Sequence, residues 1–327
     1  MQARPKLACG TAPGKVILLG EHAVVYGRTA LAASIDRHVE VAVAPAGGPA
    51  RLAALACSAD GTHWPVPVEA LERATALTGV NIADIETVAS ANLPFSVGLG
   101  SSAALSVALI RALALFSGQS PTDTEVCAHA FEIEKLFHGF PSGIDNTVVT
   151  YGGLLAFRHG ATPRPVALRK PVPLVVAIGQ TARETQKTVR GLRQRWEADP
   201  GQYEPMFDEI DGLAGAAESA LSTGDFARLG KLMDANHELL RRMKISTEEL
   251  DQMVSLARRS GACGAKLTGG GGGGAIICLC DGDRQGLVDA FTRSGWQAFS
   301  TDISKAEETI ESGDDGERFE QRHSARA

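Results

Sequence analysis

The alternation of apolar and polar residues predicts a first half that combines a sheet with helices. Short apolar runs bounded by glycine are typical of strands, and longer runs with an apolar residue every three or four positions are typical of helices. On this pattern we predict strands at 15–19, 31–44, 85–91, 144–150 and 154–157, and helices at 67–77, 101–118 and 123–138.

The second half has a different pattern, in which helices come first and strands follow. The proline-rich stretch at 163–173 marks the boundary between the two halves. Beyond it we predict strands at 174–178, 264–267, 275–280 and 296–302, and helices at 185–196, 204–221, 225–243, 247–259 and 284–294. This order predicts an α+β fold rather than a doubly wound one.

Composition narrows the class of protein. The chain has 327 residues, which suits two domains, and 44% hydrophobic with 21% charged residues is ordinary for a globular protein. Its net charge of −6, without a long Lys/Arg block, argues against partners such as nucleic acid or anionic membrane. No apolar run approaches the roughly 18 residues that span a bilayer, and no secretory leader is visible, so we predict a cytoplasmic protein that binds small molecules.

Glycine and cysteine point to special backbone geometry rather than to disulfides or zinc. The 36 glycines exceed the usual share and are bunched in a few segments. The six cysteines lack the CxxC spacing of a zinc site, and we predict that they are reduced and mostly buried, with Cys278 and Cys280 packing on one strand face.

The segment PFSVGLGSSAAL, from Pro94 to Leu105, is the best candidate for binding phosphate. Its glycines lead directly into a helix whose first N–H groups lack internal acceptors, which favours an anion there. A simple N-cap serine after a turn is the alternative. The GxGxxA spacing also fits a dinucleotide-binding turn, but the acidic residue that such a turn needs about 20 residues later is missing.

Two carboxylates beyond this segment are candidates for chemistry. On a helical wheel Glu134 falls within the apolar arc of the helix ending at His138, where it must be paired or bind a metal such as Mg²⁺. A salt bridge or a hydrogen bond to His138 would satisfy it equally. Asp145 lies at the start of the predicted strand after HGFPSG, where it either accepts turn amides or is held against a substrate hydroxyl.

Two further segments have unusual patterns. In APGKVILLGEHAVVYG, Lys15 opens a strand, and Glu21 and His22 follow the glycine at its end. They are either solvated edge and turn residues or part of a site. In KLTGGGGGGAIICLC, six glycines separate two short apolar strands, which favours close contact with a ligand or loop over a flexible linker.

Together and in this order, GKVILLGEHAVVYG, PFSVGLGSSAA, HGFPSGIDN and KLTGGGGGGA resemble the motifs of the galactokinase, homoserine kinase, mevalonate kinase and phosphomevalonate kinase (GHMP) superfamily. The GEHAVVxG pattern is most similar to its mevalonate kinase members. The resemblance implies a two-lobed fold. It comprises an N-terminal lobe with a mixed sheet and helices (1–170), a helix-rich ferredoxin-like C-terminal lobe (171–310) and a disordered tail (311–327).

The resemblance also implies roles for individual residues. Asp145 would be the catalytic acid-base residue, with Lys15 as its electrostatic partner. The other implied groups are the ATP-binding residues Pro94, Gly98, Leu99, Gly100, Ser101 and Ser102, the Mg²⁺ ligands Ser102 and Glu134, and the substrate-binding residues Glu21, His22 and Thr185. Around Thr185 the family often has Ser-Thr-Lys, whereas this chain has Glu-Thr-Gln.

The implied activity is ATP- and Mg²⁺-dependent phosphorylation of the 5-hydroxyl of (R)-mevalonate by a cytoplasmic homodimer. A glycine cradle, a metal and a lysine are also the parts that phosphoryl transfer requires. The alternatives are a kinase for another small alcohol or sugar, and a ligand sensor of the same fold without turnover. An oxidoreductase would require nicotinamide binding.

Overall fold

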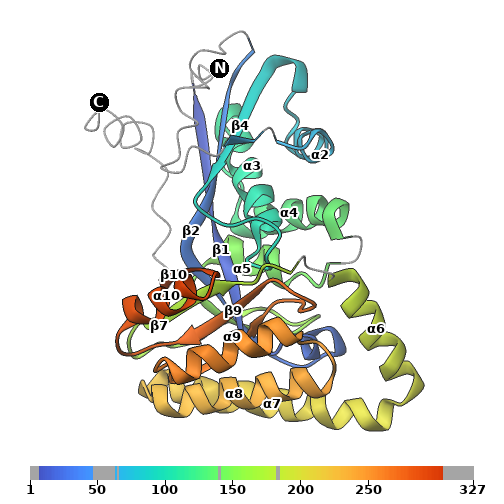
Figure 1. Cartoon of the computed structure of the whole chain (residues 1–327). Helices are drawn as coiled ribbons and strands as arrows, with labels where there is room; N and C mark the ends of the chain where they lie inside the picture. The colour runs from blue at the N-terminus through green and yellow to red at the C-terminus, as the bar shows by residue number, and fades with distance from the viewer. Residues whose placement is uncertain (1–6, 47–62, 65, 139–140, 182–184, 305–327) are drawn as a thin grey trace.

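The computed structural model describes residues 7–46, 63–64, 66–138, 141–181 and 185–304. Within this part, the strands form two sheets, the first built around long strands in the upper half of Figure 1 and the second lying in the lower half among several helices. The predicted tail at 311–327 and Cys57 lie outside the described residues. Among the described helices, none is long and apolar enough to cross a bilayer.

The first sheet is organised by one long strand, β2, which pairs with β1, β4 and β5. Its strands are β1 (Ala8–Leu19), β2 (Ala30–Pro45), β3 (His63–Trp64), β4 (Ile85–Ala91), β5 (Leu154–Phe157) and β6 (Arg164–Pro165). Short 3-10 turns, η1 (Ala23–Tyr26) and η2 (Ile82–Asp84), precede β2 and β4. Lys15 is thus carried in the middle of β1, opposite Ser34 of β2.

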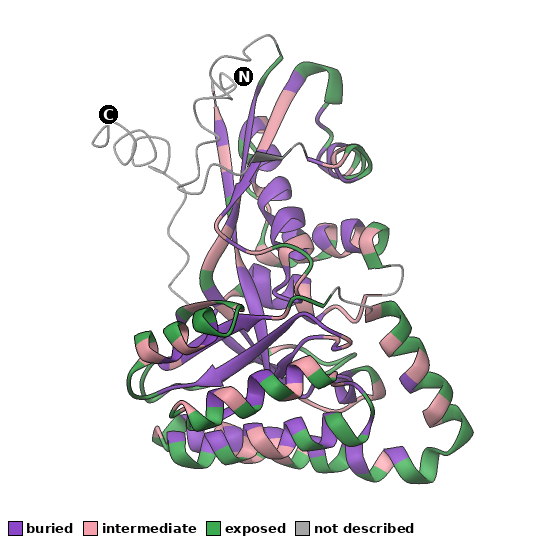
Figure 2. Ribbon diagram, in the orientation of Figure 1, coloured by how far each residue is buried: buried purple, intermediate pink, exposed green. Residues whose placement is uncertain are grey.

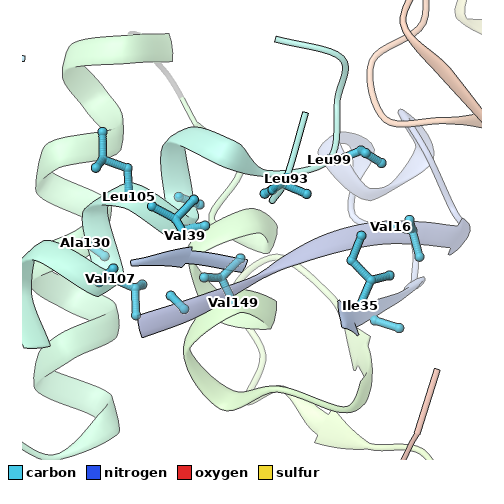
Figure 3. Packing of buried hydrophobic residues seen from close by; sticks show 14 of the residues in the cluster. Val16, Ile35, Val39, Leu93, Leu99, Leu105, Val107, Ala130 and Val149 are labelled. Carbon is cyan, nitrogen blue, oxygen red and sulfur yellow. The ribbon is translucent and has the colours of Figure 1, made fainter. Parts of the chain in front are cut away.

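Helices cover one face of this sheet. They are α2 (Val68–Thr78), α3 (Ser101–Ser117), α4 (Asp123–His138) and α5 (Ile144–Tyr151). Helix α3 is buried on nearly every side because it lies between the sheet and its neighbouring helices, as its almost wholly apolar sequence requires. Figure 3 shows the shared core, to which β1, β2, α3, α4 and α5 contribute Val16, Val39, Val107, Ala130 and Val149.

The second sheet has the strand order β10-β7-β9-β8 and follows a β-α-β-β-α-β succession. Its strands are β7 (Val172–Ile178), β8 (Gly264–Thr268), β9 (Ala275–Leu279) and β10 (Gln297–Ile303). Its helices are α6 (Thr185–Ala198), α7 (Pro200–Thr223), α8 (Phe226–Arg242), α9 (Glu248–Arg259) and α10 (Arg284–Arg293). This arrangement confirms the predicted α+β class and the strand order of a ferredoxin-like lobe.

The two sheets share a hydrophobic cluster. Val16 of β1 and Leu174 of β7 both belong to it, so β1 is packed against the second sheet as well as the first. The first sheet ends at β6 and the second begins at β7, and both strands start within the proline-rich stretch 163–173. The division at residue 170 stays a prediction.

Two expectations about the strands are wrong. Residues 144–150 form helix α5 instead of a strand, so Asp145 lies in the first turn of a helix. The run of β-branched residues there reads equally as a short buried helix, and Gly143, with φ 86°, starts that helix. The first sheet is also not mixed, because every pairing in the described part of the chain is antiparallel, and short connections such as 20–29 cannot make the crossover that a parallel pair requires.

Candidate active site

The glycine-rich segment before α3 lies directly over the middle of β1. The backbone N–H of Lys15 donates to the carbonyl oxygen of Leu99 at 2.8 Å, which ties the segment to the strand. Gly100 has φ 74°, and a Cβ placed there would lie 2.7 Å from Cγ of Lys15. The close approach therefore requires glycine at position 100.

The N-terminus of α3 is suited to an anion. Gly100 is its N-cap, and among the described residues no side chain caps it. The positive end of the helix dipole is thus available to a phosphate, beside the partly buried Ser101 and Ser102. Pro94, Gly98 and Leu99 lie in the same bent segment, as predicted.

Lys15 and Asp145 meet beneath this helix end. Nζ of Lys15 lies 3.0 Å from Oδ1 of Asp145; the lysine side chain is 2% exposed, whereas that of Asp145 is 31% exposed. The carboxylate is thus held by a buried cation at one oxygen while it remains open to a ligand. Asp145 lies in the first turn of α5, at the positive end of the helix dipole.

Glu134 of α4 is buried, as its place in the apolar arc predicts, with 1% of its side chain exposed. The hydroxyls of Ser102 and Ser106 donate to its two oxygens at 3.2 and 3.4 Å, and Nε2 of His138 lies 3.6 Å from Oε2. Burial, and then the charge of Asp145, raise the pKa of Glu134 to about 8. The structure thus shows the hydrogen-bonded alternative, with His138 close by, whereas the role of Glu134 as a Mg²⁺ ligand stays a prediction.

These side chains fit a magnesium ion that is bound jointly by protein and phosphate. No cluster of three or more His, Cys, Asp or Glu side chains suited to a metal occurs in the described ranges. Mg²⁺ usually takes one or two carboxylates and completes its shell with water and substrate phosphates. The buried carboxylate of Glu134, which accepts a hydrogen bond from Ser102, matches that donor set.

The turn after β1 is held by the second half of the chain. Each of its three residues bonds to a different element. The N–H of Gly20 donates to Oδ1 of Asn236 on α8 at 3.2 Å, Oε1 of Glu21 accepts from Nζ of Lys266 on β8, and Nε2 of His22 lies 3.1 Å from the carbonyl oxygen of Gly270. The turn that carries Glu21 and His22 is therefore anchored by hydrogen bonds to α8, β8 and the loop after β8.

Two residues of this turn, Gly20 and His22, have positive φ angles. Gly20 has φ 103°, and a Cβ there would overlap Ala30 of β2, so only glycine allows the turn. His22 has φ 62°, which is uncommon for a residue with a side chain and costs of order 1–3 kcal/mol. Such strain persists where surrounding contacts impose it, and it is often found at functional sites.

The six glycines join β8 to β9 as a tight loop, so the linker interpretation is wrong. Four of them in succession, from Gly271 to Gly274, have positive φ angles. A Cβ on Gly271 would lie 2.5 Å from the carbonyl oxygen of Ile245, and the N–H of Gly272 donates to that same oxygen at 3.0 Å. The loop is thus a packed element of the site. Cys278 and Cys280, by contrast, are buried among apolar side chains, as predicted.

Thr185 is the predicted site residue that lies in the second half of the chain. It starts α6, which runs along the right-hand edge of Figure 1, and its hydroxyl is buried without a partner in the described part of the chain. No contact that the structure describes joins Thr185 to the Lys15–Asp145 pair. Gly139, Phe140 and Glu184 lie outside the described residues.

The sequence-based reasoning missed Lys266 and Asn236. The sequence motifs include Lys266 only as the first residue of the glycine-rich segment, without a role of its own. A lysine within an otherwise apolar strand is a signal that could have identified it, because such a side chain needs a buried partner. Asn236 lies at the apolar spacing of α8, between Met233 and Leu240, so the helical pattern that predicts the burial of Glu134 could have identified it as a buried polar residue as well.

Comparisons with known proteins identify related sequences. Residues 66–153 match the profile described as GHMP kinases N terminal domain, and residues 217–296 match that described as GHMP kinases C terminal. The mevalonate kinase of Methanothermobacter thermautotrophicus is 33% identical over 308 residues, which cover 90% of this chain and 97% of that protein.

Solved structures show the same similarity. The crystal structure of L. major mevalonate kinase in complex with R-mevalonate superposes with a TM-score of 0.79 at 29% identity, covering 91% of this chain and 96% of that chain. The mevalonate kinase of Methanococcus jannaschii gives a TM-score of 0.76 at 26% identity, covering 93% and 100%. The two-lobed arrangement is thus shared over nearly the whole length of these proteins.

Proposed function

This chain belongs to the GHMP kinase family, and from that premise we propose that it transfers the γ-phosphoryl group of ATP to the primary 5-hydroxyl of (R)-mevalonate, forming 5-phosphomevalonate for isoprenoid synthesis. The observation that carries the reaction type is the Lys15–Asp145 pair, 3.0 Å apart and directly beneath the glycine-rich N-terminus of α3. The substrate follows from the mevalonate kinases that the chain resembles over 90% of its length.

The phosphates of ATP would bind at the segment from Pro94 to Ser102. The close approach of Gly100 to Lys15 brings the backbone and the uncapped N–H groups of α3 next to the lysine. Transfer of a phosphoryl group depends mainly on positioning and on neutralising the charge on its oxygens. The helix dipole and the buried ammonium group would both act on that charge.

Glu134 and Ser102 would hold Mg²⁺ at this place. The metal, when bound, neutralises charge on the phosphate oxygens. The chain contributes a carboxylate that is fixed by the hydroxyls of Ser102 and Ser106.

Asp145 would orient the 5-hydroxyl and accept its proton. As the alcohol oxygen bonds to the γ-phosphorus, the bond from that phosphorus to the bridging oxygen of ADP breaks and the hydroxyl proton passes to the Asp145 carboxylate. Lys15 holds that carboxylate in place through direct contact at 3.0 Å. The half-exposed position of Asp145 leaves it open to the substrate.

Glu21 and His22 would line the mevalonate pocket, and Thr185 is proposed to face it from α6. Buried polar groups that only the correct substrate satisfies discriminate more strongly than apolar contacts do. A homodimer and a cytoplasmic location remain predictions from the resemblance, and sedimentation of the purified protein tests the first of them.

The proposal is tested by measuring ADP release with ATP, Mg²⁺ and a panel of alcohols. We expect mevalonate to have the highest kcat/KM, with galactose and homoserine as poor substrates. A higher kcat/KM for a sugar would leave the kinase assignment intact and overturn the substrate. Binding of mevalonate without ADP release would indicate a sensor. A fluorescence titration with a nicotinamide dinucleotide tests the oxidoreductase alternative, which requires that this cofactor binds.

Glu134→Gln should raise the Mg²⁺ concentration needed for half-maximal rate and lower kcat. The amide keeps the shape and the hydrogen bonds to serine but is a poor ligand for a hard cation. The measurement is the initial rate against free Mg²⁺ at saturating ATP. Glu132→Gln, on the same helix but on the exposed face where Glu132 pairs with Arg73 and Lys135, is the matched control. An unchanged Mg²⁺ requirement in Glu134→Gln would favour a purely structural carboxylate.

The same variant has a second readout in the metal-free protein. The folded pKa of Glu134 is about 8 and the ordinary value is 4.5, so the folded state binds more protons between these values. The contribution of Glu134 to stability is therefore present below about pH 4.5 and is lost as pH rises through about 8. We expect thermal stability to fall over this window in the parent and to fall less in Glu134→Gln.

A further inference from the structure

We propose that Lys266 is a positioning residue for the reaction. It holds one carboxylate oxygen of Glu21, so that the other oxygen can bind a hydroxyl of the substrate and Lys15 can remain paired with Asp145. This inference deepens the proposed function and rests on it. It assigns a role to a residue far from the reacting atoms in sequence, 245 positions beyond Glu21.

Lys266 and Glu21 form an ion pair that is shielded from water. Both side chains have no exposed area, and Nζ of Lys266 donates to Oε1 of Glu21 and, at 2.6 Å, to the carbonyl oxygen of Leu267. Burial lowers the pKa of Lys266 and raises that of Glu21, and each charge counteracts the effect on its partner. Removing one member would leave the other as an uncompensated buried charge.

The pairing leaves one oxygen of Glu21 unused. Oε2 is buried and has no hydrogen-bond partner among the described residues. A buried carboxylate oxygen without a donor is costly, and a substrate hydroxyl would satisfy it. Because Lys266 takes Oε1, it determines which oxygen stays available and fixes its orientation.

The backbone on both sides of Glu21 is anchored, which restricts the positions that its carboxylate can take. Gly20 is held by Asn236 of α8 and His22 by Gly270 of the glycine loop, so both neighbours of Glu21 are anchored. The remaining freedom lies in the side-chain torsions of Glu21. Lys266, on β8 immediately before the glycine loop, is the contact that removes it.

The charges around Lys15 explain why this restraint matters for catalysis. Lys15 is paired with Asp145 at 3.0 Å, whereas the cation in contact with Glu21 is Lys266. Lys266 supplies Glu21 with a cation of its own. Without Lys266, Glu21 loses the contact that orients its carboxylate, and we expect the pocket to change.

The test is Lys266→Met, which removes the ammonium group and keeps a long apolar side chain in the buried space. Steady-state kinetics should show KM for mevalonate raised at least 10-fold and kcat lowered, with KM for ATP within twofold of the parent. A purely structural lysine would lower the melting temperature and leave these constants unchanged in the folded fraction.

The double variant Glu21→Gln/Lys266→Met keeps the test decisive if the single variant fails to fold, because it buries no unpaired charge. If Lys266 acts through Glu21, its removal has no further effect on KM or kcat once residue 21 is neutral, so the double variant matches Glu21→Gln. A full additional loss in the double variant would overturn the proposal.

Thr268→Val is the matched control on the same strand. Thr268 is buried, and its hydroxyl accepts from the N–H of Ile17 at 2.9 Å and donates to its carbonyl oxygen at 3.1 Å, so valine weakens the docking of β8 on β1 without touching Glu21. We expect a lower melting temperature with an unchanged KM for mevalonate. An equal rise in KM in Thr268→Val would assign the effect to strand docking and overturn the role of Lys266. A parent protein inactive on mevalonate would instead contradict the proposed function itself.

Discussion

Asp145→Asn should lower kcat by about 10²- to 10⁴-fold while the protein stays folded. The amide neither accepts the hydroxyl proton nor pairs with Lys15 as a carboxylate, although it has nearly the same shape. Because the Asp145 side chain is 31% exposed and Lys15 only 2%, the substitution leaves a buried ammonium without its partner. A modest loss of stability should therefore accompany the loss of rate.

The measurement is single-turnover transfer from ATP to mevalonate, with binding of mevalonate followed separately by calorimetry. Asp123→Asn is the matched control, since Asp123 also lies in the first turn of a helix and pairs with an arginine, Arg111, at 3.5 Å. It should keep the parental rate. A rate for Asp145→Asn within a few-fold of the parent, with mevalonate still bound, would count against a catalytic Asp145.

Local patterns predicted the elements that carry the site, because helical and strand periodicity depends on neighbouring residues. The position of Glu134 in an apolar arc was enough to predict its burial, and the structure confirms it. The glycines before Ser101 likewise predicted an uncapped helix start. These features are properties of single segments of the chain.

The features that the sequence did not predict depend on contacts between distant segments. The pair of Glu21 with Lys266 and the bond from Gly20 to Asn236 join positions more than 200 residues apart, and periodicity carries no information on such contacts. Helix α5 was predicted as a strand because a short buried apolar run fits both structures. Six of its eight residues are buried by the sheet and by α3 and α4, so burial on nearly all sides hides the helical period.

The resemblance to the GHMP family assigns roles to residues that hydrophobic periodicity cannot assign. It is closer at the first motifs than around Thr185. It implies that Lys15 is the electrostatic partner of Asp145, and the structure places the two side chains 3.0 Å apart. It also placed Thr185 at the site, where the local residues depart from the usual Ser-Thr-Lys and no described contact links Thr185 to the pair. The role of Thr185 therefore stays a prediction.

Gly100→Val should weaken ATP binding at least 10-fold and reduce turnover correspondingly. A Cβ at this position lies 2.7 Å from Cγ of Lys15, and φ 74° is a conformation that branched side chains rarely adopt. The backbone must shift away from β1 to relieve the overlap. That shift moves the N–H groups of α3 that are proposed to bind the phosphates, and it displaces Lys15 from Asp145.

Calorimetric titration with ATP measures the effect, and circular dichroism shows whether the variant is folded. Gly79→Val separates the effect of backbone strain from the effect of contact with Lys15. Gly79 has a similar φ of 69°, and no atom lies within 4 Å of a Cβ placed there. This control should lose stability and retain the parental affinity for ATP. Gly100→Ala adds only the overlapping Cβ and should show a smaller loss in the same direction. If folded Gly100→Val binds ATP as tightly as the parent, the segment before α3 is not the phosphate site, and the assignment of Ser102 beside it fails as well.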